Sequence, residues 1–531
     1  MPSRQDTLRR TVAAIDIGSN AVRFAAARAT AGGGLRMLEE RRRPTRLGAN
    51  LATTGRLPRT AQRLTLAAVK EFCLDASRLG ASVVRLVATA AVRESPDGAT
   101  FVSRLSRETG FPVSIIDTDE EARLAFRSCA GTYDLSRRHV AIVDIGGGSV
   151  QIALARHGLL YDAISLPLGA VRLTAGSDGL ESAKSRRHVR QHIRSVLSES
   201  LPRPGVDAGP LDAVIGCGGT FATLDALLSA HRSATGSSTP PGLAISGGKP
   251  RPLRSRARTR ASVIACIDSV LRASASERES LLRACGVPED RADILPAGLL
   301  VAEQVIRSLD PRALVTHVGG VRDGLLRDLA APVPDPHAIV PAAREALRSF
   351  APDELAHCTH VSHLAVSLLH ELADVEPLRG TLRLEHGAAE LLEAAALLHD
   401  LAVPIDYARH HKLGRRAIEL TPLPFSARDR AVVANVVRYH RRALPTLEHA
   451  PFRALTPRDR DVVRVLAGIL RIADGLDRAH DQGVHGLRTV VQPGRLRIVA
   501  EGVGEAGLKG ARKKADLLSL ALRRVVRIEP G

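Results

Sequence analysis

Two stretches of the chain share one pattern of apolar and polar positions. Residues Val12–Arg28 and Val140–Arg156 align position by position, so that Asp16 in the first matches Asp144 in the second. In each copy, small and β-branched residues run up to an Asp-x-Gly sequence, and a second apolar run follows. Such runs on either side of a glycine turn are typical of two adjacent buried strands. The pattern predicts two β-hairpins and, because they are alike, two similar half-domains.

The apolar positions after each hairpin predict alternating helices and strands, which indicates an α/β fold. We expect the first half-domain over residues 1–130 and the second over 131–328. Within the second, residues 231–260 are rich in Ser, Gly, Pro and Arg without an apolar period, which is typical of a mobile basic insertion with no ligand of its own. Helices are predicted at 60–79, 120–129 and 221–229 and after Ser185, and strands at 83–88, 113–116 and 213–216.

The pattern of apolar positions changes after a proline-rich linker at residues 329–341. From 342 to about 475, leucine and alanine recur every three or four residues, which predicts helices with one apolar face. Two short strands are predicted at 488–491 and 495–500, and a segment rich in Gly and Lys follows. Residues 517–528 fit either a helix or a strand. The pattern predicts a third domain over 342–531, all-α with a small α/β end.

Composition narrows the class of protein. With 531 residues the chain is too long for one core, and its 44% apolar and 25% charged residues are ordinary for a soluble protein. The net charge of +19 favours a polyanionic partner or simply solubility. Aromatic residues make up 2%, with no tryptophan, which argues against base stacking and against recognition of a specific nucleic-acid sequence.

Targeting signals and cysteine pairs are not evident in the sequence. No stretch approaches about 20 uninterrupted apolar residues, so we expect no membrane span. Asp16 interrupts the first apolar run, which makes it a poor signal peptide. Six cysteines without a C-x-x-C pair indicate reduced thiols, and we expect a cytoplasmic protein.

The glycine turns are the strongest functional signal. Free backbone N–H groups in such a turn, or at the start of a helix, favour a bound anion, and an aspartate on the turn can hold a divalent cation. Two such turns, one from each half-domain, would bind a phosphate chain from both sides of a cleft. The candidate phosphate-binding residues on these turns are Gly18, Ser19, Asn20, Gly146, Gly147, Gly148, Ser149, Gly218, Gly219 and Thr220.

Six segments in order carry a resemblance to one family: Asp16–Arg23, Ala88–Glu94, Glu120–Leu124, Asp144–Ser149, Leu166–Leu173 and Gly218–Thr220. Together they resemble the exopolyphosphatase and guanosine pentaphosphate phosphohydrolase (Ppx/GppA) family. The resemblance implies two ribonuclease-H-like domains of the actin-like ATPase superfamily around a cleft. It also implies hydrolysis of a terminal phosphoanhydride with magnesium or manganese.

Roles for individual residues follow from this resemblance. Glu121, or its neighbour Glu120, would orient or deprotonate the attacking water. Asp144, with Asp16, would hold the metal ion, while Arg23 and Arg93 would neutralise phosphate charge. The alternative to a catalytic role for the two glutamates is a structural one, because the N-terminus of a helix favours negatively charged side chains. Where the family usually carries a glutamate after its second glycine turn this chain has Gln151, and an amide does not ligate a cation as a carboxylate does.

The histidines after residue 356 carry a second resemblance, to the HD-domain metal phosphohydrolases. Its segments are His357–Ala365, His399–Asp400, His410–Lys412, Arg438–His440 and Arg471–Asp474. By resemblance the ligand candidates in this HD-like domain are His357, His399, Asp400 and Asp474, with His411 and His440 for a second divalent metal. The alternative is a buried hydrogen-bond network without metal. Relatives often read His-His-Lys-His-Ser where this chain has Leu413 and Gly414, so one contact is expected to be lost.

Three functions stay open on the sequence. The first is an exopolyphosphatase that releases terminal phosphate from inorganic polyphosphate. The second is a guanosine pentaphosphate phosphohydrolase that uses the same cleft. The third is a regulator that binds polyphosphate or guanosine tetraphosphate without hydrolysing it, and Gln151 motivates that alternative. By analogy with long family members, a homodimer is also expected.

Overall fold

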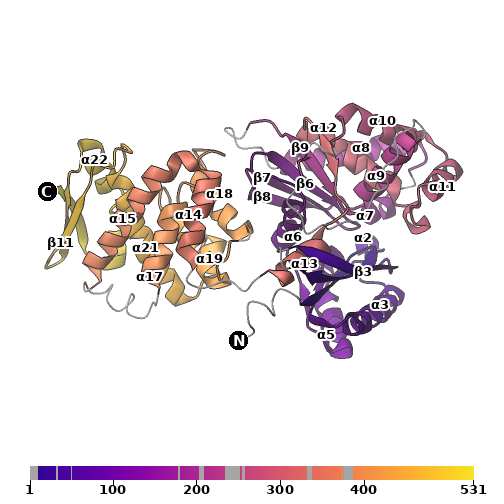
Figure 1. The fold of residues 1–531 in the computed structure, drawn as a ribbon, viewed down its shortest axis with the longest axis horizontal. Helices are drawn as coiled ribbons and strands as arrows, with labels where there is room; N and C mark the ends of the chain where they lie inside the picture. Colours follow the sequence, from indigo (N-terminus) through magenta and orange to yellow (C-terminus); the bar gives the residue numbers. More distant parts are fainter. Residues whose placement is uncertain are drawn as a thin grey trace. The chain divides into compact units, whose positions relative to one another are not determined.

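The computed structural model describes residues 10–30, 34–49, 51–177, 180–201, 209–233, 251–253, 257–331, 338–373, 375, 387–421 and 423–531. These residues form two compact units, one up to residue 331 and one from residue 338 onward (Figure 1). Most of the segment predicted as a basic insertion (234–250 and 254–256) lies outside the described residues, as do residues 332–337 of the predicted linker.

The first unit contains two five-stranded sheets of the same topology, in the order β3-β2-β1-β4-β5 and β8-β7-β6-β9-β10. In the first sheet, β1 is antiparallel to β2 and parallel to β4. In the second sheet, β6 is likewise antiparallel to β7 and parallel to β9. The predicted repeat and α/β fold are therefore confirmed. The strands are β1 (Thr11–Ile17), β2 (Ala21–Ala29), β3 (Leu35–Pro44), β4 (Ala81–Ala88), β5 (Val113–Ile115), β6 (His139–Ile145), β7 (Val150–Arg156), β8 (Leu159–Leu166), β9 (Ala213–Cys217) and β10 (Leu314–Thr316).

Apolar and polar residues do not alternate along the central strands, because helices cover both faces of their sheet. Every residue of β1 is buried. On one face, Ile15 and Ile17 pack with residues of α3 (Arg59–Arg78) and α5 (Gly98–Thr109). On the other face, Val12 and Ala14 pack with residues of α13 (Val321–Ala330). Two-sided burial explains the continuous apolar run.

The two halves exchange their last helices. Helix α6 (Thr118–Ala130) follows the last strand of the first sheet but contacts β7 and β8 of the second. Helix α13 follows the last strand of the second sheet, yet Leu325 and Leu326 join the core of the first. The two helices contact each other between the sheets (Figure 1). This exchange places the start of α6 where the two halves meet.

Among the remaining helices of the first unit, two were predicted from the sequence, and both begin earlier than expected. Helix α8 begins two residues before Ser185 because Ser182 caps it, accepting a hydrogen bond from the Ser185 N–H at 3.0 Å. Helix α9 begins at Gly218, three residues earlier than predicted. These helices are α2 (Leu51–Thr54), α4 (Ala90–Glu94), α7 (Ala170–Ala175), α8 (Ala183–Ser200), α9 (Gly218–Ser233), α10 (Arg260–Arg272), α11 (Ala275–Ala284) and α12 (Leu295–Leu309).

The second unit is helical and ends in a small three-stranded sheet of order β11-β12-β13. Both predicted strands are present, and the ambiguous segment 517–528 is a helix followed by a strand, separated at Arg523 in the left-handed conformation. Helix α22 lies in the Gly- and Lys-rich segment, where no helix was predicted. The elements are α14 (Ile339–Phe350), α15 (Leu355–Leu372), α17 (Ala388–Leu398), α18 (His410–Leu420), α19 (Ala427–Tyr439), α20 (Ala450–Arg453), α21 (Pro457–Leu476), β11 (Gly486–Gln492), β12 (Arg495–Glu501), α22 (Glu505–Lys513), α23 (Asp516–Leu522) and β13 (Val525–Pro530).

Two further sequence-based expectations concern membrane spans and cysteine pairing. No helix within the described ranges is both long and apolar enough to cross a bilayer. All six cysteines are free thiols.

Candidate active site

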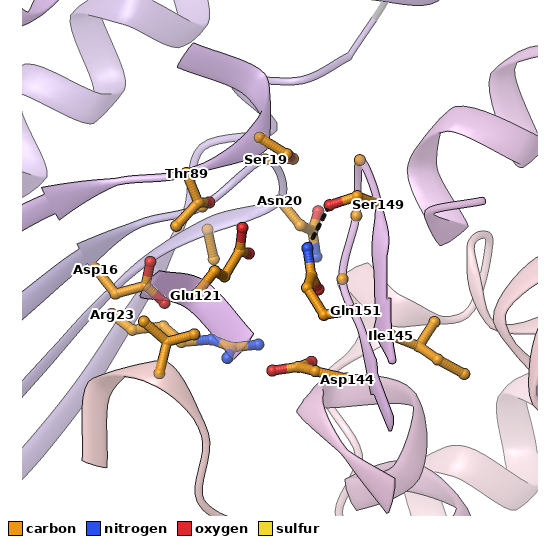
Figure 2. A pocket seen from close by; sticks show the side chains of 17 residues that line it. Asp16, Ser19, Asn20, Arg23, Thr89, Glu121, Asp144, Ile145, Ser149 and Gln151 are labelled. Carbon is orange, nitrogen blue, oxygen red and sulfur yellow. Dashed lines mark hydrogen bonds between the residues drawn. The ribbon is translucent and has the colours of Figure 1, made fainter. Parts of the chain in front are cut away.

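The two glycine turns face each other across one pocket (Figure 2). The turn between β1 and β2 supplies one wall, and the turn between β6 and β7 supplies the other. The pocket measures about 580 Å³ with the open solvent at its mouth. Its lining residues are Asp16, Gly18, Ser19, Asn20, Ala21, Arg23, Thr89, Ala90, Glu121, Asp144, Ile145, Gly146, Gly147, Gly148, Ser149, Gln151 and Val321. The predicted convergence of the two turns is thus present in the structure.

The two turns have the same hydrogen bond and lie in contact. The Gly18 N–H donates to Ala21 O at 3.2 Å, and the Gly146 N–H donates to Ser149 O at 3.0 Å. A Cβ atom at Gly148 would lie 2.8 Å from the Ser19 Oγ of the opposite turn. A side chain at this position would therefore require the Ser19 hydroxyl to move.

Two aspartates, the buried Asp16 and the half-buried Asp144, lie near the ends of the first strands of the two hairpins and line the pocket. Burial raises the pKa of Asp16, and it raises the pKa of Asp144 to about 6; Arg23 opposes both shifts. One oxygen of Asp16, Oδ1, has no hydrogen-bond partner among the described residues. A buried oxygen without a partner, in a pocket that a second carboxylate also lines, is an arrangement that a hard divalent cation can satisfy. The residues present therefore fit Mg²⁺ or Mn²⁺.

The start of α6 distinguishes between the two candidate glutamates. Glu121 lines the pocket and is 8% exposed. Glu120 instead forms ion pairs with Arg123 at 2.7 Å and Arg85 at 3.6 Å, and it is not among the described residues of the pocket. Asp117 caps the helix by accepting a hydrogen bond from the Glu120 N–H at 2.8 Å. The cap fixes which carboxylate faces the cleft.

Arg93 contacts Glu121 rather than the pocket space. Its Nη1 lies 3.0 Å from Glu121 Oε2 and donates to Ile116 O at 2.8 Å. Burial nevertheless raises the pKa of Glu121 to about 7; Arg93 opposes this shift, and the charges of Asp144 and Asp16 add to it. A carboxylate with a pKa near neutral pH is suited to accept a proton from water.

Gln151 and Arg23 occupy the same place in the two hairpins. Arg23 pairs in register with Asp16, and Gln151 pairs in register with Asp144. The Gln151 Nε2 donates to Ser149 Oγ at 2.7 Å, as the dashed line in Figure 2 marks. The pocket therefore has a cation on one side and a neutral amide on the other.

A second pocket of about 410 Å³, including open solvent, adjoins the first and shares Asn20, Arg23 and the second glycine turn. Gly219 and Thr220 line this second pocket, as do Arg291, Ile294 and Leu295. Gly218 has a φ of +80°, and a Cβ atom there would lie 2.2 Å from Asp144 Oδ1. Gly218 thus allows the backbone to pass directly beside the aspartate.

Sequence reasoning missed some lining residues. Thr89 follows β4, which runs parallel to β1, so both strands end at the same edge of the sheet. That topology could have identified Thr89, since its segment was already singled out. Val321 reaches the pocket through the exchange of α13, and Arg291 comes from a short 3-10 helix (Glu289–Arg291). No local signal marks either of them.

The second unit brings most of the predicted HD-like residues together. Among the described residues, two groups have ligand atoms within 4.8 Å of one another, namely His357–His399–Asp400 and Asp400–His410–His440. Asp474 Oδ1 lies 4.0 Å from His357 Nε2. His410 takes part in this cluster, whereas its neighbour His411 belongs to neither group.

The fold and the facing turns define the class of protein: two half-domains of actin-like ATPase fold that close on a polar pocket. The model of the Ppx/GppA phosphatase family matches residues 26–331, and that of Ppx/GppA phosphatase domain III matches residues 345–490. The chain belongs to the Ppx/GppA phosphatase family, as the sequence resemblance indicated, and this membership supports a hydrolase.

Individual relatives agree with this assignment. The chain is 29% identical over 316 residues to exopolyphosphatase 1 of Mycobacterium tuberculosis, which covers 59% of this chain and 86% of the relative. It is 28% identical over 316 residues to exopolyphosphatase 1 of Mycobacterium leprae, with 59% and 87% covered. The crystal structure of an exopolyphosphatase from Cytophaga hutchinsonii has the same fold, with a TM-score of 0.52, 20% identity, and 60% of this chain and 98% of that chain covered.

Proposed function

We propose that the protein is an exopolyphosphatase that hydrolyses the terminal phosphoanhydride of inorganic polyphosphate and releases orthophosphate. One observation carries this proposal: Glu121, Asp16 and Asp144 converge in a single pocket between two glycine turns. Phosphoryl transfer to water needs positioning and charge stabilisation rather than a covalent intermediate. The pocket combines a base, a cation site and anion-binding backbone.

Each part of the pocket has a role in this reaction. Glu121 orients a water molecule and takes its proton as the oxygen attacks the terminal phosphorus. The N–H groups and hydroxyls of the turns at Ser19 and Ser149 hold the phosphate oxygens. Arg23 neutralises charge on the side of the first hairpin. Asp16 and Asp144 would hold Mg²⁺ or Mn²⁺, which supplies further neutralisation when bound.

The choice between substrates rests on the pockets and on charge. None of the described residues that line the two pockets is aromatic, and the chain carries a net charge of +19. These features favour a linear polyanion over a guanine nucleotide. The observation that favours guanosine pentaphosphate as a second candidate is the second pocket, whose Ile145, Ile294 and Leu295 offer apolar surface for a nucleoside.

Phosphate release from both compounds, measured side by side with the full chain and Mg²⁺, tests this proposal. We expect the higher kcat/KM with long-chain polyphosphate, together with a KM for polyphosphate that rises with salt concentration. A higher kcat/KM with guanosine pentaphosphate would favour the second candidate. No turnover of either compound, with tight binding of one, would favour the regulator.

The raised pKa of Glu121 predicts the pH dependence of the reaction. Below its pKa of about 7 Glu121 is protonated and cannot accept a proton, so kcat/KM should fall tenfold per pH unit on the acid side. The rate should level off above that pH. Because a bound cation favours the ionised carboxylate, raising the Mg²⁺ concentration should move the midpoint to lower pH. A profile that is flat between pH 5 and 8 would exclude Glu121 as the base.

The substitution Gln151→Glu tests the effect of the amide at this position. A carboxylate there would add another anionic group beside Asp144, on the same hairpin as Ser149. We expect the Mg²⁺ concentration for half-maximal activity to fall several-fold, because oxygen ligands of higher charge bind Mg²⁺ more tightly. Titration of phosphate release with Mg²⁺ measures this. An unchanged midpoint would show that position 151 does not face the cation.

A further inference from the structure

Helix α7 lies directly against the second glycine turn and belongs to Leu166–Leu173, a segment without a role in the proposed reaction. The structure describes this segment in full, and none of its residues lines the first pocket. The N-cap of α7 is Gly169, where a Cβ atom would lie 2.2 Å from the carbonyl carbon of Gly148. Because that clash would involve backbone, only glycine allows α7 to approach the turn this closely.

The carbonyl oxygens of this turn all accept hydrogen bonds from the start of α7. The donors are four consecutive backbone N–H groups at 2.9 to 3.3 Å: Gly169 to Gly148 O, Ala170 to Gly146 O, and Val171 and Arg172 to Gly147 O. In a trans peptide unit the N–H points opposite to the carbonyl. The N–H groups of Gly147, Gly148 and Ser149 therefore point away from α7, and these three residues line the first pocket. Helix α7 thus orients the N–H groups that bind phosphate in the proposed reaction.

The side chain of Arg172 connects this turn to the first half-domain. Its Nε donates to Gly148 O at 2.9 Å, and its Nη2 donates to Glu94 Oε2. Glu94 is the last residue of α4, so a single guanidinium holds the turn of one half and a helix of the other. Arg172 lines a smaller pocket that adjoins the first at Ser19 and Gly148. It lies behind the turn and not in the space that the phosphate would occupy.

The two half-domains contact each other at the same place. A Cβ atom at Gly148 would lie 3.2 Å from the Ala90 Cβ of α4, and one at Gly147 would lie 3.1 Å from the Ser19 Cβ. Helix α7 also contacts α2 of the first half-domain. Backbone and small side chains therefore set the separation of the two turns. The guanidinium of Arg172 adds direction to this contact, because its N–H groups form a rigid planar fork.

We propose that Arg172 and Glu94 are positioning residues that hold the two glycine turns at the separation and orientation that hydrolysis requires. This inference rests on the proposed function, since it assigns the two residues a role in that reaction. The bond from Arg172 Nε fixes the carbonyl of Gly148 and, through the same peptide unit, the N–H group of Ser149. The bond to Glu94 fixes that turn relative to the first half-domain. Arg172 itself does not contact the phosphate.

The substitution Glu94→Gln distinguishes positioning from direct binding of phosphate. It removes the charge that Arg172 pairs with and leaves the bond from Arg172 to Gly148 O in place. If Arg172 bound phosphate itself, releasing its charge would lower the KM for polyphosphate. In the proposed role kcat should instead fall about two- to fivefold, with KM unchanged within about twofold, because a partly exposed ion pair contributes little.

Removing the guanidinium should have the larger effect. Arg172→Met loses both bonds, and we expect kcat to fall at least about tenfold, because hydrogen bonds from a charged donor are among the stronger ones. The double variant Glu94→Gln/Arg172→Met should match Arg172→Met, since Glu94 acts only through Arg172. The matched control is Glu108→Gln, which breaks a partly exposed ion pair with Lys70 (2.7 Å) inside the first half-domain. Neither residue of that pair lines the two pockets, so kcat and KM should not change.

Hydrogen exchange at the amides of residues 169–172 gives a readout that needs no substrate. These amides donate to the turn, so loosening of the contact exposes them to solvent. Measured by mass spectrometry on the full chain, their exchange should be several-fold faster in Glu94→Gln and Arg172→Met than in the unsubstituted chain and in Glu108→Gln. Absence of polyphosphate turnover in the unsubstituted chain would contradict the proposed function, whereas exchange alone decides whether the two residues hold the turn. Equal exchange in all four proteins, a lower KM in Glu94→Gln, or a double variant slower than Arg172→Met by the factor seen for Glu94→Gln would overturn the inference.

Discussion

Replacing Glu121 by Gln should lower kcat for phosphate release by about 10²- to 10⁴-fold, the usual contribution of a positioned general base. The amide has nearly the same shape and can still contact Arg93, but it cannot take a proton from water. Because the side chain is buried and carries a raised pKa, its replacement by a neutral group should not disturb the fold. Affinity for polyphosphate should change little. Phosphate release and equilibrium binding, measured on the same preparation, test both expectations.

Glu120→Gln is the matched control for this experiment. Glu120 precedes Glu121 on the same helix and carries the same chemical group, but its carboxylate pairs with Arg123 and Arg85 outside the pocket. We expect a change in kcat of no more than a few-fold. If Glu120→Gln were the more damaging substitution, the assignment of the base would be wrong.

The second large effect is expected for Asp144→Asn. Asp144 is half-buried near the end of β6, lines the pocket with Asp16, and lies beside Gly218 at the start of α9. Loss of its charge should weaken the cation site, because Mg²⁺ strongly prefers ionised oxygen ligands. We expect kcat/KM to fall at least about 100-fold at a fixed Mg²⁺ concentration, in line with the several kcal/mol that a bound metal contributes to such reactions.

A titration with Mg²⁺ distinguishes a lost cation site from a distorted pocket. If Asp144→Asn acts on the cation, the Mg²⁺ concentration for half-maximal activity should increase, and activity should recover in part at high Mg²⁺. Far-UV circular dichroism should remain that of the unsubstituted chain. Full activity of Asp144→Asn at low Mg²⁺ would show that Asp144 does not bind the ion.

The local pattern of the sequence was sufficient for the two hairpins, for four helices of the first unit, and for the helical character of the second unit. In β1 and β6 an unbroken apolar run ends at an Asp-x-Gly turn, and this information lies within a few residues. The segment that forms α22 was not predicted as a helix because Gly507 and Gly510 disfavour helix on their own. Contact between α22 and α21 outweighs that preference, and such contact is not visible in a local pattern.

The site showed a second limit of sequence reasoning. Adjacent residues of a helix point about 100° apart, so only one of two neighbours can face a given site. Sequence reasoning left Glu120 and Glu121 as alternatives, and the resemblance to the HD-domain proteins offered His411, not His410, as a ligand of a second metal. The cap at Asp117 determines which glutamate faces the pocket, and the start of α18 at His410 determines which of two buried histidines lies in the cluster with Asp400. Both depend on where a helix begins, which patterns locate least accurately.

The exchange of α6 and α13 between the two halves cannot be predicted from the local sequence pattern. Leu325 and Leu326 lie just before the predicted linker, yet they pack with Val12 and Ala14, which lie near the start of the chain. Val321 reaches the pocket by this route. Long-range contacts of this kind are set by the core as a whole rather than by neighbouring residues.

The most direct test of the central claim is the position of the isotope label after hydrolysis of long-chain polyphosphate in ¹⁸O-labelled water. If water held by Glu121 attacks the terminal phosphorus, each released orthophosphate should carry one ¹⁸O atom, and the shortened chain should carry none. Unlabelled orthophosphate with label at the new chain end would mean that the attack occurs at the penultimate phosphorus. That result, or the absence of released orthophosphate, would contradict the account.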